Sequence, residues 1–253
     1  MFTFIAKNWT ISNIETVLFD KDGTFIDLHY FWGKMTEMRA KAVIKKYTLN
    51  EDVFLTLCSF LGYDVNSGRM LPNGITALYS RVKIIELFRD DLSEIGVNAT
   101  EEELTQIFDD VAEEFYKDIQ KYTKPIPEAV EFIKDLRSKG AKVGIVTSDS
   151  VVSTKLTLKQ FDWENLFDVI VGRESSSETK ESGALTKIAL EKLNADPVTT
   201  LMIGDAPMDA ISAQNAGLEK TVLVASGQVG INELEEYSIY VLDSLRELTC
   251  LKI

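Results

Sequence analysis

Two carboxylates lie two residues apart in segment 19–24, with the sequence FDKDGT, directly after the apolar run 17–19. They occupy the end of an expected buried strand, and open α/β folds bind ligands at the carboxyl ends of their strands. Gly23 permits a sharp exit from the strand, while Asp20 and Asp22 could divide the work of nucleophile and proton donor. Calcium-binding loops and surface turns also favour Asp-x-Asp-Gly, so these alternatives stay open for the motif alone.

A second pair of carboxylates follows another apolar run. Residues 201–203 (LMI) lead into segment 204–209 (GDAPMD), in which Asp205 and Asp209 stand at the start of an expected helix. An N-cap role would explain one of these aspartates but not both. The two pairs together indicate an acidic site assembled from separate strand ends.

Two further segments carry groups suited to a phosphate. The apolar run 143–146 ends in Thr147-Ser148-Asp149, which offers hydroxyls and exposed backbone amides to phosphoryl oxygens. The same residues also fit an ordinary helix cap. Lys180 lies in the polar segment 174–182, and a lysine in such a loop is by itself typical of a solvated surface charge.

Short apolar runs predict the elements that position these side chains. They cover residues 17–19, 143–146, 169–171, 201–203 and 222–224. Residues 128–139 have apolar side chains at helical spacing and stop at Gly140, and residues 209–216 repeat this pattern up to Gly217. The alternation predicts an α/β fold with a Rossmann-like doubly wound parallel sheet and helices on both faces.

The interval 28–123 breaks this alternation, because its periodicity is helical and it contains no comparable β-branched run. Helices are expected over 30–47 and 74–89. A third begins at a capping box of Thr100 and Glu103 and has an apolar face of Leu104, Ile107, Phe108, Val111 and Phe115. We therefore expect residues 28–123 to form an inserted all-helical cap domain, and residues 1–27 and 124–253 to form one core domain.

The ordered set Asp20-x-Asp22-Gly23-Thr24, Thr147, Lys180 and Gly204-Asp205-x-x-x-Asp209 resembles the motifs of the haloacid dehalogenase (HAD) superfamily. Residues 125–148 and 203–217 are also similar to its phosphoglycolate phosphatase-like branch, which has a helical cap after the first motif. Two positions depart from that branch. Ser148 stands where asparagine is frequent, and Glu181 stands where proline is frequent.

This resemblance implies a phosphatase that hydrolyses a small phosphate monoester with Mg²⁺ as cofactor. Asp20 would attack phosphorus and form an aspartyl-phosphate, and Asp22 would act as general acid and base. Mg²⁺ would be bound by Asp20, by the backbone carbonyl of Asp22 and by Asp205, while Asp209 would orient this shell. Thr147, Ser148 and Lys180 would hold the phosphoryl group.

Two other functions stay open. A phosphosugar mutase uses the same aspartyl chemistry but returns the phosphoryl group to the sugar, and a non-catalytic interaction protein would retain only the fold. The intact motif set argues against the second. The choice of ester depends on cap residues, among which Arg81 and His29 are candidates. A structural role is the stronger interpretation of both, as a solvated or ion-paired residue for Arg81 and as a packing or hinge residue for His29.

The composition limits the classes of binding partner that we expect. There are 27 Lys and Arg residues against 40 Asp and Glu residues, and the net charge of -13 would repel a nucleic-acid backbone. No apolar stretch approaches the ~20 residues of a membrane span, and the two cysteines are far apart, as in a reduced protein. We expect a cytoplasmic protein without signal peptide or membrane anchor that acts on a small phosphorylated metabolite. The oligomeric state stays open.

Overall fold

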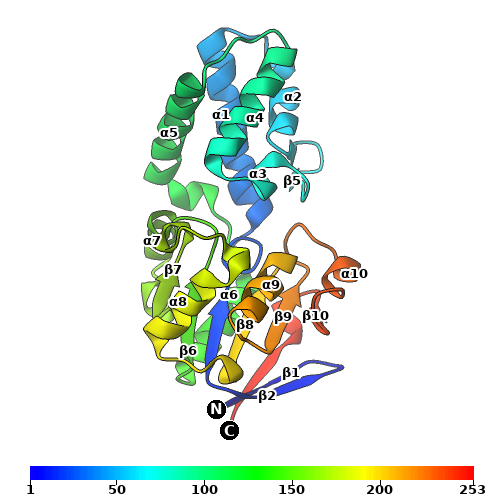
Figure 1. Cartoon of the computed structure of the whole chain (residues 1–253), viewed down its shortest axis with the longest axis vertical. Helices are drawn as coiled ribbons and strands as arrows, with labels where there is room; N and C mark the ends of the chain where they lie inside the picture. Colours follow the sequence, from blue (N-terminus) through cyan, green and yellow to red (C-terminus); the bar gives the residue numbers. More distant parts are fainter. The chain divides into compact units, whose positions relative to one another are not determined.

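The structure is a computed structural model that describes residues 1–253. The chain divides into two compact units, one made of Met1–Asp27 with Lys124–Ile253 and the other of Leu28–Thr123. We call them the core unit and the inserted unit. Figure 1 shows that strands dominate the middle of the core unit, whereas the inserted unit consists mainly of helices.

The core unit is built on a six-stranded sheet with the order β10-β9-β8-β3-β6-β7, in which every neighbouring pair is parallel. The strands are β3 (Thr16–Phe19), β6 (Lys142–Val146), β7 (Val169–Val171), β8 (Thr200–Gly204), β9 (Lys220–Val224) and β10 (Tyr240–Leu242). All five apolar runs are strands, which confirms the predicted α/β fold. The edge strand β10 was not expected.

Helices cover both faces of this sheet. They are α6 (Pro127–Ser138), α7 (Val151–Gln160), α8 (Ala184–Leu193), α9 (Pro207–Asn215) and the short α10 (Ile231–Leu234). In Figure 1, α8 and α9 lie in front of the sheet and α6 lies behind it. Leu18 and Met202 point from the sheet toward α8 and α9, where they pack in one apolar cluster with Leu185 and Ala213.

The order of the strands places β3 and β8 side by side at the centre of the sheet. From β3 the chain moves outward to β6 and β7, and it then returns to β8 on the other side of β3. Because crossovers between parallel strands are right-handed, this reversal moves the following helices to the opposite face. A crevice opens at the carboxyl ends of the strands at such a switch point.

A second, antiparallel sheet joins the two ends of the chain. It contains β1 (Phe2–Ile5), β2 (Thr10–Ile14) and β11 (Thr249–Lys252) in the order β11-β1-β2. The ring of Phe4 packs against that of Phe132 of α6, with 6.1 Å between centroids. The sequence did not predict this sheet, because its strands are short and pair residues from opposite ends of the chain.

The inserted unit contains α1 (Leu28–Tyr47), α2 (Phe54–Phe60), α3 (Ile75–Leu78), α4 (Arg81–Glu94) and α5 (Glu101–Lys117). The predicted capping box is confirmed, since the Thr100 hydroxyl accepts from the Glu103 N–H and the Glu103 carboxylate accepts from the Thr100 N–H, at 3.2 Å each. The predicted apolar face of α5 is buried.

Two expectations for this unit are wrong in detail. It is not all-helical, because β4 (Tyr63–Asp64) and β5 (Arg69–Met70) form a small hairpin. The Asp64 carboxylate stabilises its turn by accepting hydrogen bonds from the Asn66 N–H and the Ser67 hydroxyl. The helix expected over 74–89 is broken into α3 and α4, because Tyr79 and Ser80 adopt extended backbone conformations.

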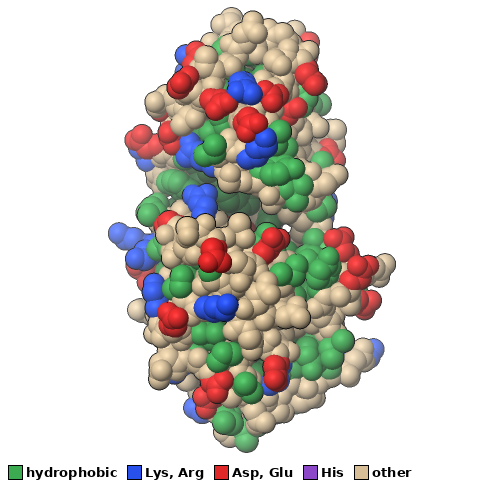
Figure 2. Space-filling model, in the orientation of Figure 1, with side chains coloured by type: hydrophobic (Ala, Val, Ile, Leu, Met, Phe, Trp, Pro, Cys, Tyr) green, Lys and Arg blue, Asp and Glu red, His purple; other side chains and the backbone are tan.

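The outer surface carries charges of both signs. In the view of Figure 2, acidic and basic side chains are interspersed over the visible face of each unit.

None of the helices combines the length and the apolar character needed to cross a bilayer.

Candidate active site

Three buried carboxylates meet at the carboxyl ends of β3 and β8. Asp20, Asp205 and Asp209 each offer an oxygen that lies within 4.8 Å of the other two. Their residues are only 8%, 3% and 1% exposed. The parallel register pairs Phe19 with Ile203, and the N–H of Asp20 donates to the carbonyl of Ile203 at 2.9 Å. The two motifs are therefore neighbours because their strands are neighbours.

Asp209 organises the turn between β8 and α9. Its Oδ2 accepts hydrogen bonds from the backbone N–H groups of Asp205 and Ala206, at 3.1 Å each. Its Oδ1 lies 2.6 Å from the ammonium of Lys180. Both oxygens of Asp209 are thus engaged by the protein itself, an arrangement that suits an orienting role.

Lys180 lies inside the acidic cluster. Its residue is 5% exposed, and its Nζ is 2.6 Å from Oδ1 of Asp20 as well as from Oδ1 of Asp209. Burial alone would lower the pKa of Lys180, but the two carboxylates outweigh burial and raise it above the ordinary value. The surface-lysine interpretation is therefore wrong, and the absence of proline at position 181 does not prevent this placement.

Burial raises the pKa values of Asp20 and Asp205. Burial raises the pKa of Asp20 to about 7, although Lys180 acts in the opposite direction. Burial, followed by the negative charges of Asp20 and Asp209, raises the pKa of Asp205 well above its usual range. The cluster holds more negative charge than Lys180 neutralises, and its donors are all oxygens. This donor set fits a hard divalent cation such as Mg²⁺.

The turn after β3 packs directly on Asp205. Gly23 has a φ of +91°, and a Cβ built on it would lie 2.2 Å from Oδ2 of Asp205. The hydroxyl of Thr24 donates to Oδ1 of the same carboxylate at 3.1 Å. Only glycine at position 23 leaves room for this carboxylate. Gly23 and Thr24, which follow β3, therefore position Asp205, which follows the neighbouring strand β8.

One contributing segment was missed by the sequence analysis. The loop after β9 brings Gly227 so close that a Cβ there would lie 1.7 Å from Oδ2 of Asp205. The Ser226 hydroxyl donates to the carbonyl of Gly23 at 2.6 Å. The available signal was position, since a small polar pair soon after an apolar run reaches the same sheet edge as the recognised motifs.

Asp22 is held by a lysine that received no role from the sequence. Oδ1 of Asp22 lies 2.7 Å from Nζ of Lys21, which also lies 3.0 Å from Oδ2 of Asp149. Lys21 is fully buried. Burial opposes its charge, but Asp149 and then Asp22 raise the pKa of Lys21, so the ammonium remains protonated. The sequence feature that could have predicted this role is a lysine between two aspartates directly after a buried strand.

The predicted phosphate-binding hydroxyls lie after β6. Thr147 is buried, and its Oγ1 accepts the N–H of Asp149 at 3.1 Å. Ser148 is exposed, and its hydroxyl points to the sulfur of Met208 at 3.6 Å. The register of β3 with β6 places this segment beside the loop of Lys21 and Asp22. Phosphate binding by Thr147 and Ser148 stays a prediction.

The two candidates in the inserted unit have partners within that unit. Nδ1 of His29 accepts the backbone N–H of Met70 at 3.0 Å. Arg81 forms an ion pair with Asp109 at 2.7 Å. These contacts match the structural alternatives that the sequence left open for both residues, and contact with a substrate stays a prediction.

Comparisons with known proteins identify relatives that are named as hydrolases and phosphatases. Residues 14–217 match the family described as haloacid dehalogenase-like hydrolase. A protein named pyrophosphatase PpaX from Bacillus mycoides is 30% identical over 240 residues, which are 93% of this chain and 95% of that protein. The phosphoglycolate phosphatase of Aquifex aeolicus is 28% identical over 219 residues, covering 87% of this chain and 88% of that protein. A crystal structure from Haemophilus somnus, described as a predicted phosphoglycolate phosphatase, shares the fold with a TM-score of 0.72 at 18% identity, covering 93% of this chain and 96% of that one.

Proposed function

Because this chain belongs to the haloacid dehalogenase-like hydrolase family, we propose that it is a Mg²⁺-dependent phosphatase of small phosphate monoesters. One observation carries the proposal: Asp20, Asp205, Asp209 and Lys180 converge at one edge of the sheet. The names of the relatives, a pyrophosphatase and a phosphoglycolate phosphatase, support it.

Asp20 is the proposed nucleophile. A bond forms between one of its carboxylate oxygens and phosphorus while the bond from phosphorus to the leaving oxygen breaks, which gives an aspartyl-phosphate. Lys180, 2.6 Å from Oδ1 of Asp20, fixes the direction of the carboxylate and adds positive charge where the phosphoryl oxygens gather. Thr147 completes the phosphate-binding side.

Asp22 is the proposed proton-transfer group. It donates a proton to the leaving oxygen in the first step. In the second step it removes a proton from water, whose oxygen bonds to phosphorus as the bond to Asp20 breaks. Phosphate leaves and the carboxylate of Asp20 is restored. Only 11% of the Asp22 side chain is exposed, and its ion pair with Lys21 holds it in one direction.

Asp20, the backbone carbonyl of Asp22 and Asp205 are the residues proposed to hold Mg²⁺, with Asp209 as their orienting partner. When bound, the ion neutralises the charge that otherwise repels an anionic nucleophile from a phosphate. At about 4 Å, this repulsion is roughly 4 kcal/mol per pair of unit charges at an effective dielectric of 20.

The proposal extends to the setting and the substrate. Cys58 and Cys250 are buried free thiols, which suits a reduced, cytoplasmic environment. The proposed substrate is a small phosphorylated metabolite rather than a nucleic acid, in keeping with the net charge of -13.

The test is phosphate release from a panel of esters that includes phosphoglycolate and sugar phosphates, with inorganic pyrophosphate alongside. The wild type should release phosphate only with Mg²⁺. Asp20→Asn should lose this activity while remaining folded by circular dichroism. Asp168→Asn is the matched control, because Asp168 lies before β7 and pairs with Arg137 at the opposite edge of the sheet.

Three outcomes would redirect the assignment. Equal rates for the wild type and Asp20→Asn would reject the nucleophile. Conversion of one hexose phosphate into its isomer with little free phosphate would favour a phosphosugar mutase. A folded wild type that releases no phosphate from any compound with Mg²⁺ would favour the non-catalytic alternative.

A further inference from the structure

Lys21 occupies an unusual position between two loops of the core unit. Its side chain is fully buried, whereas lysine is almost never fully buried unless it is paired. Its Nζ lies 2.7 Å from Oδ1 of Asp22 and 3.0 Å from Oδ2 of Asp149. The ammonium therefore connects the loop after β3, which supplies the proposed acid and base, with the loop after β6, which supplies Thr147.

The backbone fixes Lys21 between these loops. The carbonyl of Lys21 accepts N–H groups of Thr24, Phe25 and Ile26 at 3.3, 3.1 and 3.1 Å. The strand register pairs Phe19 with Ile145, so the residues two positions further along are Lys21 and Thr147. The side chain of Lys21 reaches the β6 loop from a turn that cannot move without breaking these hydrogen bonds.

Asp149, the partner of Lys21 in the loop after β6, is also held by hydrogen bonds to the backbone. Oδ1 of Asp149 accepts the N–H of Ser150 at 2.7 Å, and the carbonyl of Asp149 accepts the N–H of Arg173 at 2.9 Å. The N–H of Asp149 donates to Oγ1 of Thr147. Lys21 is thus held on a fixed carboxylate, and Asp22 is held on Lys21.

We propose that Lys21 is a positioning residue that holds Oδ1 of the Asp22 carboxyl group, so that its other oxygen carries the proton in the direction required for transfer to the leaving oxygen, with Asp149 as the anchor of Lys21. This inference rests on the proposed function. A charge-assisted hydrogen bond is short and directional, whereas an unrestrained aspartate samples several rotamers. Proton transfer requires a heavy-atom distance of about 2.6–3.2 Å to the leaving oxygen, so loss of direction removes it.

The leaving group distinguishes positioning from a merely structural ion pair. An alkoxide leaves poorly and needs the proton of Asp22, whereas 4-nitrophenolate leaves well without it. Lys21→Met should therefore lower kcat/KM, which reports the steps up to departure of the leaving group, by tenfold or more for an alkyl phosphate such as glycerol phosphate, a part of the ~10²–10⁴ that a general acid supplies. For 4-nitrophenyl phosphate the decrease in kcat/KM should stay within about threefold, because the nucleophile Asp20 and Lys180 are unchanged and the hydrolysis of the aspartyl-phosphate comes after these steps.

Lys21→Met leaves two carboxylates without their buried cation, and a separate variant, Asp149→Asn, covers the case in which Lys21→Met folds poorly. Asp149→Asn keeps an oxygen for the Ser150 N–H but removes the anchoring charge, and it should show the same selectivity with a smaller loss. Lys21→Met in an Asp22→Asn background should add no further leaving-group selectivity, because both changes act through one group.

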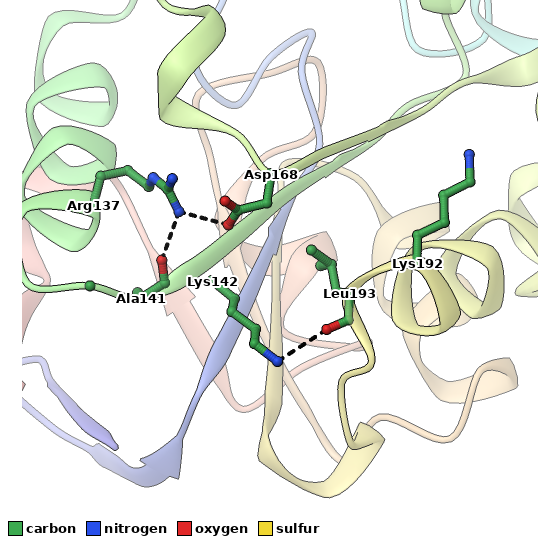
Figure 3. A pocket seen from close by; sticks show the side chains of 7 residues that line it. Arg137, Ala141, Lys142, Asp168, Lys192 and Leu193 are labelled. Carbon is green, nitrogen blue, oxygen red and sulfur yellow. Dashed lines mark hydrogen bonds and ion pairs between the residues drawn. The ribbon is translucent and has the colours of Figure 1, made fainter.

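Lys142→Met is the matched control. Lys142 begins β6 at the other end of the sheet, and its Nζ donates to the carbonyl of Leu193 at 3.0 Å (Figure 3). This variant should leave both rates unchanged. Equal decreases for the two substrates in the Lys21 and Asp149 variants, or no decrease in either, would overturn the inference while Asp20→Asn still supports the phosphatase. A wild type without Mg²⁺-dependent phosphate release would instead reject the phosphatase and this inference with it.

Discussion

The two ends of the six-stranded sheet carry ion pairs of similar residue types, but the pair at one end is buried and the pair at the other end is partly exposed to water. At the carboxyl ends, Asp20 and Lys180 form an ion pair that is nearly excluded from water, with side chains 12% and 3% exposed. At the amino ends, Arg137 and Asp168 pair at 2.6 Å with side chains 28% and 34% exposed. A pocket of about 470 Å³ lies there, lined by Arg137, Lys142, Asp168 and Lys192, among others (Figure 3).

The difference indicates that burial and charge balance, more than residue type, distinguish the end of the sheet that carries the proposed active site. At the amino edge, Lys142 donates to the Leu193 carbonyl and Arg137 donates to the Ala141 carbonyl, so the cations stabilise strand starts and the end of α8. At the carboxyl edge, carboxylates outnumber the neighbouring ammonium groups, and burial raises the pKa of Asp20 and that of Asp205. The proposed Mg²⁺ and phosphate sites lie at this edge.

The largest expected contrast is between Asp22→Asn and Asp168→Asn. Removal of the proton-transfer group should lower kcat by roughly 10²–10⁴-fold for esters with poor leaving groups. Asp168→Asn retains one acceptor oxygen, which can serve both Arg137 and the Val143 N–H as Oδ2 of Asp168 does, so kcat should not change. Steady-state kinetics on both variants test the contrast, and a comparable decrease in both would show that the two ends of the sheet are not functionally distinct.

A smaller contrast concerns the orienting carboxylate. Asp209→Asn keeps the shape but loses the charge that pairs with Lys180, and it should raise the Mg²⁺ concentration for half-maximal activity by about 10–100-fold. Asp196→Asn is its control, because Asp196 also accepts a backbone N–H, that of Val198, but does so outside the acidic cluster. Titration of activity with Mg²⁺ measures both. An unchanged Mg²⁺ requirement in Asp209→Asn would contradict the orienting role.

Mg²⁺ should also stabilise the protein in a pH-dependent manner. The pKa of Asp20 is raised from 3.8 to about 7, so the folded state without metal binds more protons than the unfolded state between these values. The stability contributed by this group is present below the unfolded pKa and is lost as pH rises through about 7. Mg²⁺ binds the ionised carboxylates, so it should stabilise the protein most above that pH.

Thermal unfolding with and without Mg²⁺ measures this effect. At about 100 times the dissociation constant, a ligand adds about 2.7 kcal/mol. For a unit of this size that amounts to roughly 5–10 °C in Tm. The increase should be larger at about pH 8 than at about pH 5.5, where protons compete for the site. Asp205→Asn should remove most of the increase, and an equal increase at both pH values would contradict the linkage.

Much of the carboxyl end of the sheet was predictable from the sequence. Each recognised motif follows a strand, and each of these strands is visible as a short apolar run in the local sequence. Asp20 and Asp205 meet because β3 and β8 are adjacent, and the βα alternation predicts strand ends at one edge. The sheet of β1, β2 and β11 was not predictable in the same way, since it depends on pairing between residues far apart in the chain. Long-range pairing leaves little local signal.

The missed site residues have a related explanation. Lys21 and Asp149 belong to loops whose roles depend on a contact across two strands, at 3.0 Å, that neither loop encodes alone. Gly227 acts through the space that it leaves for Asp205, and a residue without a side chain carries no chemical signature. Residue type and order predicted the carboxylates of the proposed site and an orienting role for Asp209, while the contacts of Lys21, Asp149 and Gly227 became visible only in three dimensions.

The smallest expected effect sharpens the comparison at two glycines with similar backbones. Gly140 follows α6 with a φ of +85°, and a Cβ there would meet only the flexible end of Lys252 at 3.6 Å. Gly140→Ala should therefore show backbone strain alone, about 1 kcal/mol, and lower Tm by roughly 2–4 °C with kcat unchanged. Gly23→Ala has similar strain but directs its methyl at Asp205, so it should lose Mg²⁺-dependent activity as well. If Gly140→Ala reduced kcat at temperatures where it is fully folded, strain at the amino edge would be transmitted to the site, and the two ends of the sheet would have to be treated as coupled.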